Sequence, residues 1–173
     1  MSNKFIFLDR DGVINKEIGY LHKIEDFEFI DGVFDSIRYL QKKNFRIVII
    51  TNQSGIGRGI YTIDDFIRLN NWMIEEFITE NIKITDTFFC PHSPQDDCLC
   101  RKPKPGMIKQ AVEKYNIDIK TSWLIGDSER DIVAGLNAGI GNTILVKSGH
   151  KINEKETKSK FIIDSIADIE LII

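Results

Sequence analysis

Residues 5–12 read Phe5-Ile6-Phe7-Leu8-Asp9-Arg10-Asp11-Gly12, which is four apolar residues followed by two acids one position apart. An uninterrupted apolar run of this length, bounded by turn residues, is typical of a buried strand. Similar runs, rich in β-branched and aromatic residues, recur at residues 47–50, 87–89, 123–125, 143–146 and 161–163. We expect all six segments to be strands.

Helical patterns separate these runs. Apolar residues repeat at three- to four-residue spacing at positions 33, 34, 37 and 40, at 66, 69, 73 and 77, and at 107, 108, 111, 112 and 115. Thr62 followed by Asp65 resembles an acidic capping box, and Pro105 is expected at the first position of a helix. Alternating strands and helices predict an α/β fold. We therefore expect one Rossmann-like, three-layer domain over residues 1–173, with a mostly parallel sheet.

Composition excludes several classes of protein. The 173 residues are 42% apolar, enough for one continuous core, and neither a repeat nor a linker interrupts them. A net charge of −3 with scattered cations argues against nucleic acid and anionic membranes as partners. No apolar run approaches the roughly 20 residues that span a bilayer. We expect a cytoplasmic monomer that acts on a small molecule, and a solvated surface loop at residues 151–160.

Polar residues collect where the expected strands end. The first run ends in Asp9 and Asp11, the second in residues 51–55, and a later one in Gly126-Asp127-Ser128-Glu129-Arg130-Asp131. An isolated Asp-x-Asp-Gly is more often only a turn, but parallel strands bring their carboxyl ends to one edge of a sheet, where ligands bind. Asp9 and Asp127 would repel one another there unless a cation lay between them. Carboxylate oxygens favour Mg²⁺.

A second metal site is predicted in the loop at residues 90–100. It holds all three cysteines of the chain, Cys90, Cys98 and Cys100, together with His92. Three thiolates and one imidazole fit a closed, tetrahedral structural Zn²⁺ site, whereas Cys-x-Cys is poorly shaped for a disulfide. The alternative is a set of free cysteines beside a surface histidine. A zinc ion would fix the loop that leads into Arg101 and Lys102. His22 and His150 lack such neighbours and are expected to be solvated.

Four segments in this order resemble the motifs of the haloacid dehalogenase (HAD) superfamily of phosphohydrolases. They are Phe-Leu-Asp-Arg-Asp-Gly-Val at residues 7–13, Ile-Ile-Thr at 49–51, Arg-Lys-Pro at 101–103 and Ile-Gly-Asp-Ser-Glu-Arg-Asp at 125–131. The resemblance covers nearly the whole chain. It implies a magnesium-dependent phosphatase that forms a covalent aspartyl-phosphate.

The resemblance also assigns roles to residues. Asp9 would be the nucleophile, and Asp11 the general acid/base whose backbone carbonyl also binds Mg²⁺. Asp9 and Asp127 would supply the carboxylate ligands of the cation. Thr51 and Lys102 would stabilise the phosphoryl oxygens. For Asp131 two interpretations stay open: orientation of the magnesium shell, or an acid that complements a helix dipole.

The gaps between motifs leave no room for a cap domain. The chain therefore resembles the capless, zinc-loop branch, which contains phosphatases of heptose 1,7-bisphosphate and of histidinol phosphate. Residues 19–22, 27–32 and 51–59 favour the heptose group. That likeness implies release of the 7-phosphate to leave heptose 1-phosphate, a precursor of nucleotide-activated heptose in surface polysaccharides such as lipopolysaccharide or capsule. The implied substrate-binding residues are Glu17, Ile18, Gly19, Tyr20, Asn52, Gln53, Ser54 and Arg101.

Three alternatives remain at this point. The first is a histidinol-phosphate phosphatase with the same chemistry. The second is a zinc-organised binding module without catalysis, against which the intact set of acids argues. The third is a phosphoryl-accepting receiver, which should lack an acid/base residue at the position of Asp11.

Overall fold

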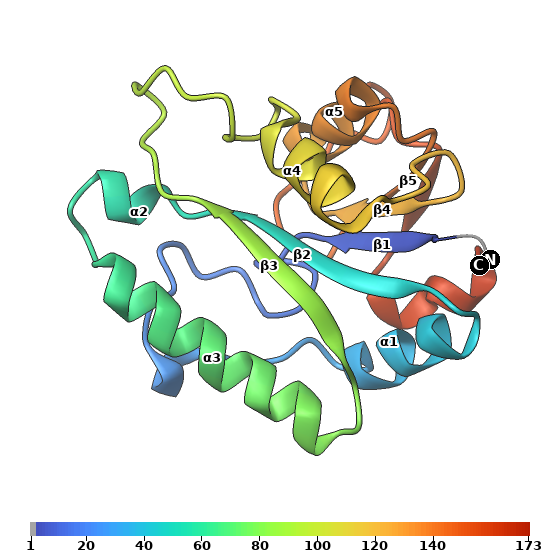
Figure 1. The fold of residues 1–173 in the computed structure, drawn as a ribbon, viewed down its shortest axis with the longest axis horizontal. Coiled ribbons are helices and arrows are strands. Elements are labelled where there is room, and N and C mark those ends of the chain that lie inside the picture. Colours follow the sequence, from blue (N-terminus) through green and yellow to red (C-terminus); the bar gives the residue numbers. More distant parts are fainter. Residues whose placement is uncertain (1–2) are drawn as a thin grey trace.

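The six predicted strands form one sheet in the computed structural model, which describes residues 3–173 (Figure 1). Their order is β3-β2-β1-β4-β5-β6, and every neighbouring pair is parallel. The strands are β1 (Phe5–Leu8), β2 (Arg46–Asn52), β3 (Ile84–Cys90), β4 (Trp123–Gly126), β5 (Asn142–Val146) and β6 (Phe161–Ile163). The predicted parallel α/β fold is confirmed, with no additional domain in the described chain.

Helices cover both faces of this sheet (Figure 1). The helices are α1 (Val33–Lys42), α2 (Ser54–Gly57), α3 (Ile63–Thr79), α4 (Gly106–Tyr115), α5 (Glu129–Ala138) and the 3-10 helices η1 (Ile24–Asp26) and η2 (Ile166–Leu171). On one face, α1, α3 and η2 pack against alternate strand residues such as Ile6 and Ile49. On the other, α4 and α5 pack against Phe7 and Ile50. Because successive strand residues point to opposite faces, each strand contributes to both cores.

Two predicted helix starts can be compared with the structure. The Thr62 side chain accepts a hydrogen bond from the Asp65 backbone, and Asp65 accepts one from the Thr62 backbone, so the capping box of α3 is confirmed. Pro105 lies one residue before α4 rather than at its first position. Its carbonyl already accepts the first helical hydrogen bond, from Lys109. The prediction was therefore wrong by one residue, because Pro suits either position at a helix start.

The order in which strands are added to the sheet reverses at β1. From β1 the chain builds β2 and β3 on one side, and it then crosses to build β4, β5 and β6 on the other. The loops after β1 and β4 therefore diverge and leave a crevice at the carboxyl edge, where ligands bind in sheets of this kind. No helix in residues 3–173 is both long enough and apolar enough to cross a bilayer.

The loop at residues 151–160 is exposed, as predicted, but it is also anchored. Thr157 donates its hydroxyl to Glu129 at 2.6 Å, and the Lys158 backbone N–H donates to the same carboxylate at 2.9 Å. Ile152 packs against the core under α5. The loop is thereby tied to the start of α5, which carries residues of the crevice.

Candidate active site

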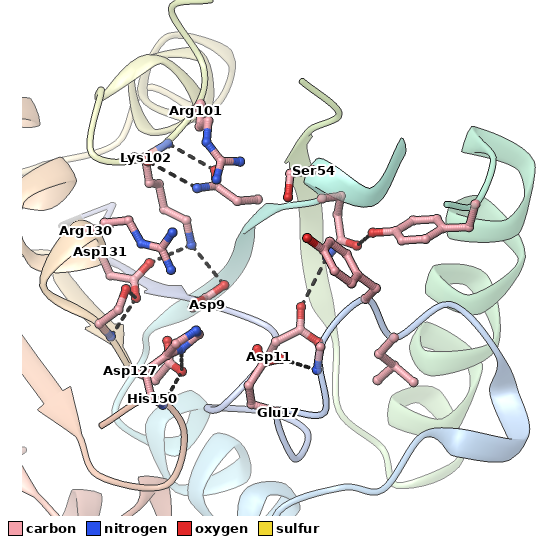
Figure 2. Close-up of a pocket in the computed structure, with 17 residues that line it drawn as sticks. Asp9, Asp11, Glu17, Ser54, Arg101, Lys102, Asp127, Arg130, Asp131 and His150 are labelled. Carbon is pink, nitrogen blue, oxygen red and sulfur yellow. Dashed lines mark hydrogen bonds and ion pairs between the residues drawn. The ribbon is translucent and has the colours of Figure 1, made fainter. Parts of the chain in front are cut away.

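A pocket of about 310 Å³ opens at the carboxyl edge of the sheet (Figure 2). It lies at the change of direction between β1 and β4. Its lining residues come from the carboxyl ends of the strands β1 to β5 and from the loops and helix starts that follow them: Asp9, Asp11, Glu17, Gly19, Tyr20, Leu21, Asn52, Gln53, Ser54, Tyr61, Arg101, Lys102, Asp127, Ser128, Arg130, Asp131 and His150. Most of the predicted site residues are therefore brought together in one place.

Asp9 stands at the floor of this pocket, directly after β1. Its Oδ1 accepts the Arg10 backbone N–H at 2.7 Å and lies 2.9 Å from the Lys102 ammonium. No described residue donates to its Oδ2. Burial raises the pKa of Asp9 well above its ordinary value, and repulsion from Asp131 adds to this while Lys102 opposes it. A carboxylate in this position requires positive charge close by.

Lys102 supplies part of that charge. Its side chain is 3% exposed, and its ammonium contacts Asp9 at 2.9 Å and Asp131 at 2.6 Å (Figure 2). The ammonium also donates to the Ile50 carbonyl at 3.0 Å. Burial alone would lower the pKa of Lys102, but Asp131 and Asp9 raise it above its usual value. The ammonium is therefore charged and held against the Asp9 carboxylate.

Asp131 caps the start of α5 and also holds Lys102, a contact that was not among the predicted alternatives. Its Oδ1 holds Lys102, and its Oδ2 accepts the Ser128 backbone N–H at 3.0 Å and the Ser128 hydroxyl at 2.9 Å. The second set of contacts caps the start of α5. Burial would raise the pKa of Asp131, but Lys102 and Ser128 together lower it. Asp131 thus orients the lysine as well as capping the helix.

Asp127 follows β4, and it provides the test of whether a cation fits. Its Oδ1 is buried and has no hydrogen-bond partner, which is rare for a carboxylate that is 1% exposed. One carboxylate oxygen each from Asp9, Asp127 and Asp131 can be chosen so that all lie within 4.8 Å of one another. An orphaned oxygen among converging carboxylates fits a hard divalent cation such as Mg²⁺.

The His150 side chain is 44% exposed, in keeping with the expected solvated loop residue, but it also has a partner that the sequence did not predict. Its ring Nδ1 lies 2.6 Å from Asp127 Oδ2, and its backbone N–H donates to the same oxygen at 3.0 Å. His150 therefore lines the pocket and contacts an expected metal ligand (Figure 2). Loop sequence carries no signal for this contact, because it depends on how the ends of β4 and β5 lie side by side. His22 stacks on the Tyr61 ring, with 5.0 Å between ring centroids.

Asp11 lines the same pocket, with its carboxylate held by three side chains. Arg10 forms an ion pair with it at 2.8 Å, Asn15 donates to Oδ1 at 2.9 Å, and Gln53 donates to Oδ2 at 3.2 Å. Arg10 is 1% exposed and was not among the predicted site residues. A buried arginine between two acids must pair with one of them. The position of Arg10 between Asp9 and Asp11 could therefore have predicted this ion pair.

The second motif lies differently from what we expected. Thr51 ends β2 but is fully buried and does not line the pocket, because Gln53 donates to its hydroxyl at 2.8 Å. The Tyr61 hydroxyl donates in turn to the Gln53 carbonyl at 2.5 Å. Burial raises the pKa of Tyr61 to about 12, so this hydroxyl stays protonated. Gln53 and the unpredicted Tyr61 thus form the pocket surface over Thr51.

The expected substrate-binding residues after β1 form one rim of the pocket. Glu17 and Gly19 line it, and the Glu17 carboxylate accepts the Gly19 backbone N–H at 2.5 Å. Burial and the neighbouring Asp11 raise the pKa of Glu17. Tyr20 also lines the pocket, whereas Ile18 is 56% exposed and does not. Ser54, at the start of α2, lies on a different wall.

Two guanidinium groups face the pocket from the opposite rim. Arg101 was predicted there, and Arg130, on the first turn of α5, was not (Figure 2). Burial lowers the pKa of Arg101, and repulsion from Arg130 lowers it further. Among the described residues neither forms an ion pair with a carboxylate. Two unpaired cations that repel one another form a surface suited to an anion.

Asn52 lines the pocket, and it also fixes the backbone of Lys102. Its side-chain carbonyl accepts the Lys102 backbone N–H at 3.0 Å, and its amide donates to the Lys102 carbonyl at 3.2 Å. The end of β2 therefore holds the segment that delivers the lysine.

The Cys/His loop begins at Cys90, the last residue of β3. Sulfur–sulfur distances from Cys90 are 3.7 Å to Cys98 and 3.1 Å to Cys100, and His92 Nδ1 lies 3.4 Å from Cys90 and 3.3 Å from Cys100. Thiolates about 2.3 Å from a tetrahedral zinc lie about 3.8 Å apart. The three thiols are free, and the four groups gather as the zinc hypothesis requires.

The chain is similar in sequence to known hydrolases. A family model described as HAD-hydrolase-like matches residues 99–169. Together with the parallel sheet and the acidic pocket, this match identifies a HAD-like hydrolase. D-glycero-beta-D-manno-heptose-1,7-bisphosphate 7-phosphatase of Pasteurella multocida is 42% identical over 98% of this chain and 96% of its own length. The alpha counterpart from Campylobacter jejuni is 49% identical over 87% of each chain. This chain belongs to the D-glycero-D-manno-heptose-1,7-bisphosphate 7-phosphatase family.

A solved structure shows the same fold. It is the D,D-heptose 1,7-bisphosphate phosphatase from B. bronchiseptica, complexed with magnesium and phosphate. That protein is 28% identical, its TM-score is 0.85, and the match covers 96% of this chain and 95% of the other. A homologue of this chain thus holds a magnesium ion. The chain itself is a HAD phosphatase of this family.

The contact between Asn52 and Lys102 generates a prediction. Asn52→Ala removes two hydrogen bonds that place the lysine, so kcat for p-nitrophenyl phosphate should fall by about 10- to 100-fold. Asn137→Ala is the matched control, because Asn137 donates to the Pro103 carbonyl at 3.3 Å from an exposed position outside the pocket. Equal kcat values for the two variants would contradict the role of Asn52.

Proposed function

We propose that this protein hydrolyses the 7-phosphate of D-glycero-D-manno-heptose 1,7-bisphosphate and releases heptose 1-phosphate and inorganic phosphate. The observation that carries the proposal is one pocket holding an acidic crevice and two unpaired guanidinium groups, in a chain 40–49% identical to curated 7-phosphatases. The acidic end has the groups for phosphoryl transfer. The basic end suits a second phosphate.

Asp9 would act as nucleophile through Oδ2, the oxygen that no described residue occupies. This oxygen forms a bond to phosphorus while the bond from phosphorus to the sugar oxygen breaks, which leaves an aspartyl-phosphate and an alkoxide. The Lys102 ammonium keeps the Asp9 carboxylate in place and adds positive charge where phosphoryl charge gathers. Asp131 and Asn52 hold that lysine from its two ends.

Asp11 would carry the proton in both steps. In its protonated form it gives a proton to the departing sugar oxygen, and as a carboxylate it then takes one from the water that attacks phosphorus. That second attack breaks the bond to Asp9 and releases phosphate. The side chains of Arg10, Asn15 and Gln53 hold the Asp11 carboxyl group in place for both steps.

Mg²⁺ is the proposed cation at the carboxylate cluster. Asp9, Asp127 and the backbone carbonyl of Asp11 would hold it, with the buried Oδ1 of Asp127 as the open ligand atom. When bound, it would neutralise charge shared by the nucleophile and the phosphoryl group, as hard cations do in phosphoryl transfer. The magnesium complex of the B. bronchiseptica homologue supports this choice of metal.

The phosphate that is not cleaved would bind the guanidinium groups of Arg101 and Arg130. Both line the pocket opposite the Glu17 rim, and the repulsion between them is relieved when an anion lies between them. This feature also separates the two candidate substrates. Histidinol phosphate carries an ammonium group in place of a second phosphate, and two nearby guanidinium groups would repel it.

Zn²⁺ is the proposed structural metal at Cys90, His92, Cys98 and Cys100. With four protein ligands such a site has no open position, so its effect would be to hold the loop that ends in Arg101 and Lys102. We further propose a monomer in the cytoplasm, where reduced thiols remain available as zinc ligands.

Assays with candidate substrates test the reaction itself. Phosphate release should be measured with both anomers of heptose 1,7-bisphosphate and with histidinol phosphate, each in the presence of Mg²⁺. We expect kcat/KM to favour a bisphosphate, and Asp9→Asn to lower kcat by more than about 1,000-fold because the nucleophile is lost. Preference for histidinol phosphate would refute the substrate, and an active Asp9→Asn protein with unchanged zinc content would refute the nucleophile.

The guanidinium pair can be tested separately. Arg130→Ala should raise KM for the bisphosphate by about 10- to 100-fold, since a charge-assisted contact is lost, and should leave KM for p-nitrophenyl phosphate unchanged. Arg68→Ala is the matched control, because Arg68 pairs with Asp65 on the surface of α3. A similar rise for both substrates would show that Arg130 does not bind the second phosphate.

Zinc removal tests the structural metal. Mass spectrometry of the purified protein should give one zinc per chain, and Cys98→Ser should lower that content. Protein stripped with a chelator should stay at least about 10-fold less active when Mg²⁺ alone is returned, because Lys102 loses its fixed loop, and should recover with Zn²⁺ and Mg²⁺ together. Full activity of the zinc-free protein with Mg²⁺ alone would contradict this role.

A further inference from the structure

The loop after β5 contacts both acidic segments of the active site, and no step of the proposed reaction uses it. It comprises residues 147–150. The Ser148 hydroxyl donates to the Gly12 carbonyl at 2.7 Å, beside the segment that carries Asp9 and Asp11. His150 lies on Asp127, beyond the end of β4. The loop therefore ties together the segments that follow β1 and β4.

His150 makes two contacts with a single oxygen of Asp127. The backbone N–H and the ring Nδ1 both reach Oδ2, at 3.0 Å and 2.6 Å. A carboxylate can only accept, so Nδ1 carries a hydrogen and donates it. The other oxygen, Oδ1, is buried and has no partner. The two oxygens of Asp127 therefore differ: Oδ2 is held by His150, and Oδ1 has no hydrogen-bond partner among the described residues.

Two glycines enclose the same carboxylate. A Cβ atom at Gly12 would lie 2.2 Å from Asp127 Oδ2, and one at Gly149 would lie 2.0 Å from it. Gly12 also has φ +84°, a conformation that favours glycine. The carboxylate is therefore packed between two backbone segments that approach as closely as glycine allows. Packing restricts where the group lies, and the two hydrogen bonds from His150 fix the rotation of the carboxylate plane.

We propose that His150 is a positioning residue that orients the Asp127 carboxylate, so that Oδ1 is presented to the catalytic cation. The role rests on the proposed use of a divalent cation by this site. It does not depend on which phosphorylated sugar is hydrolysed. Outer groups that orient metal ligands in this way commonly change metal affinity by about 10- to 100-fold. Glu17 lies in the same cluster, within 4.8 Å of Asp127 and His150 when one ligand atom of each is considered.

The test measures metal binding without substrate. Zinc-loaded protein is titrated with Mn²⁺, followed by electron paramagnetic resonance, and Mg²⁺ is then added as a competitor. His150→Ala should weaken binding of both cations by about 10-fold or more. His150→Asn should stay within about threefold of the unchanged protein, because the Asn amide can place an N–H close to the position of Nδ1.

Lys151→Ala is the matched control, since Lys151 is the next residue of the loop and is exposed. It should bind Mn²⁺ and Mg²⁺ as the unchanged protein does. In steady-state assays with p-nitrophenyl phosphate, His150→Ala should need about 10-fold more Mg²⁺ for half-maximal rate but reach a similar kcat at saturating Mg²⁺. A higher Mg²⁺ requirement with an unchanged kcat distinguishes a positioning residue from a residue that contacts the reacting atoms.

Several results would overturn the proposal. Unchanged Mn²⁺ and Mg²⁺ affinity in His150→Ala would do so, as would an Asn variant as weak as the Ala variant. Loss of Zn²⁺ or Co²⁺ binding with intact Mg²⁺ binding would show instead that His150, Asp127 and Glu17 form a ligand set of their own. Because none of these titrations involves hydrolysis, a wrong substrate assignment would leave their outcome unaffected.

Discussion

The ammonium of Lys102, buried between Asp9 and Asp131, is the interaction on which the active site depends. Breaking one side of a buried ion pair leaves an uncompensated charge, which generally costs several kcal/mol, about 3–5. Here one cation balances two acids that come from different segments, the end of β1 and the start of α5. Lys102 therefore helps to hold the Asp9 carboxylate in its charged form and in its position.

Three parts of the chain converge to place that lysine. Asn52 holds its backbone from the end of β2, Asp131 holds its ammonium from α5, and the Cys/His loop precedes it directly in sequence. The loop is itself fixed to the second strand, since the Gln53 backbone N–H donates to the Cys90 carbonyl at 2.8 Å. A disturbance at the Cys/His cluster would therefore reach Asp9 through covalent bonds and short hydrogen bonds.

Local sequence was sufficient for the sheet and for most of the pocket. Strands that are apolar on both faces read as unbroken runs, and parallel topology then places their final residues together, which is why the order of residues alone groups Asp9, Asp11 and Asp127. Helix starts were less certain, as Pro105 shows, because the same residue type suits two adjacent positions.

What local sequence could not predict depends on contacts between distant loops. The burial of Thr51 beneath Gln53 follows from the side chain of Tyr61, and the position of His150 follows from the adjacency of β4 and β5. Arg10 was overlooked although a charged residue beside a buried strand always needs a partner. Arg130 resembles any exposed residue on the first turn of a helix until Arg101 is seen to share its pocket.

The absence of a second domain over the pocket has a kinetic consequence. In enzymes with a lid, closure and reopening often limit turnover, and closure excludes water only after the substrate has bound. In the described chain the walls are loops and helix starts at the ends of the strands, so the residues that can contact a substrate already line the pocket before it binds. Changes in preference could therefore evolve by exchange of rim residues such as Tyr20 or Arg130, while the acids at the strand ends stayed the same.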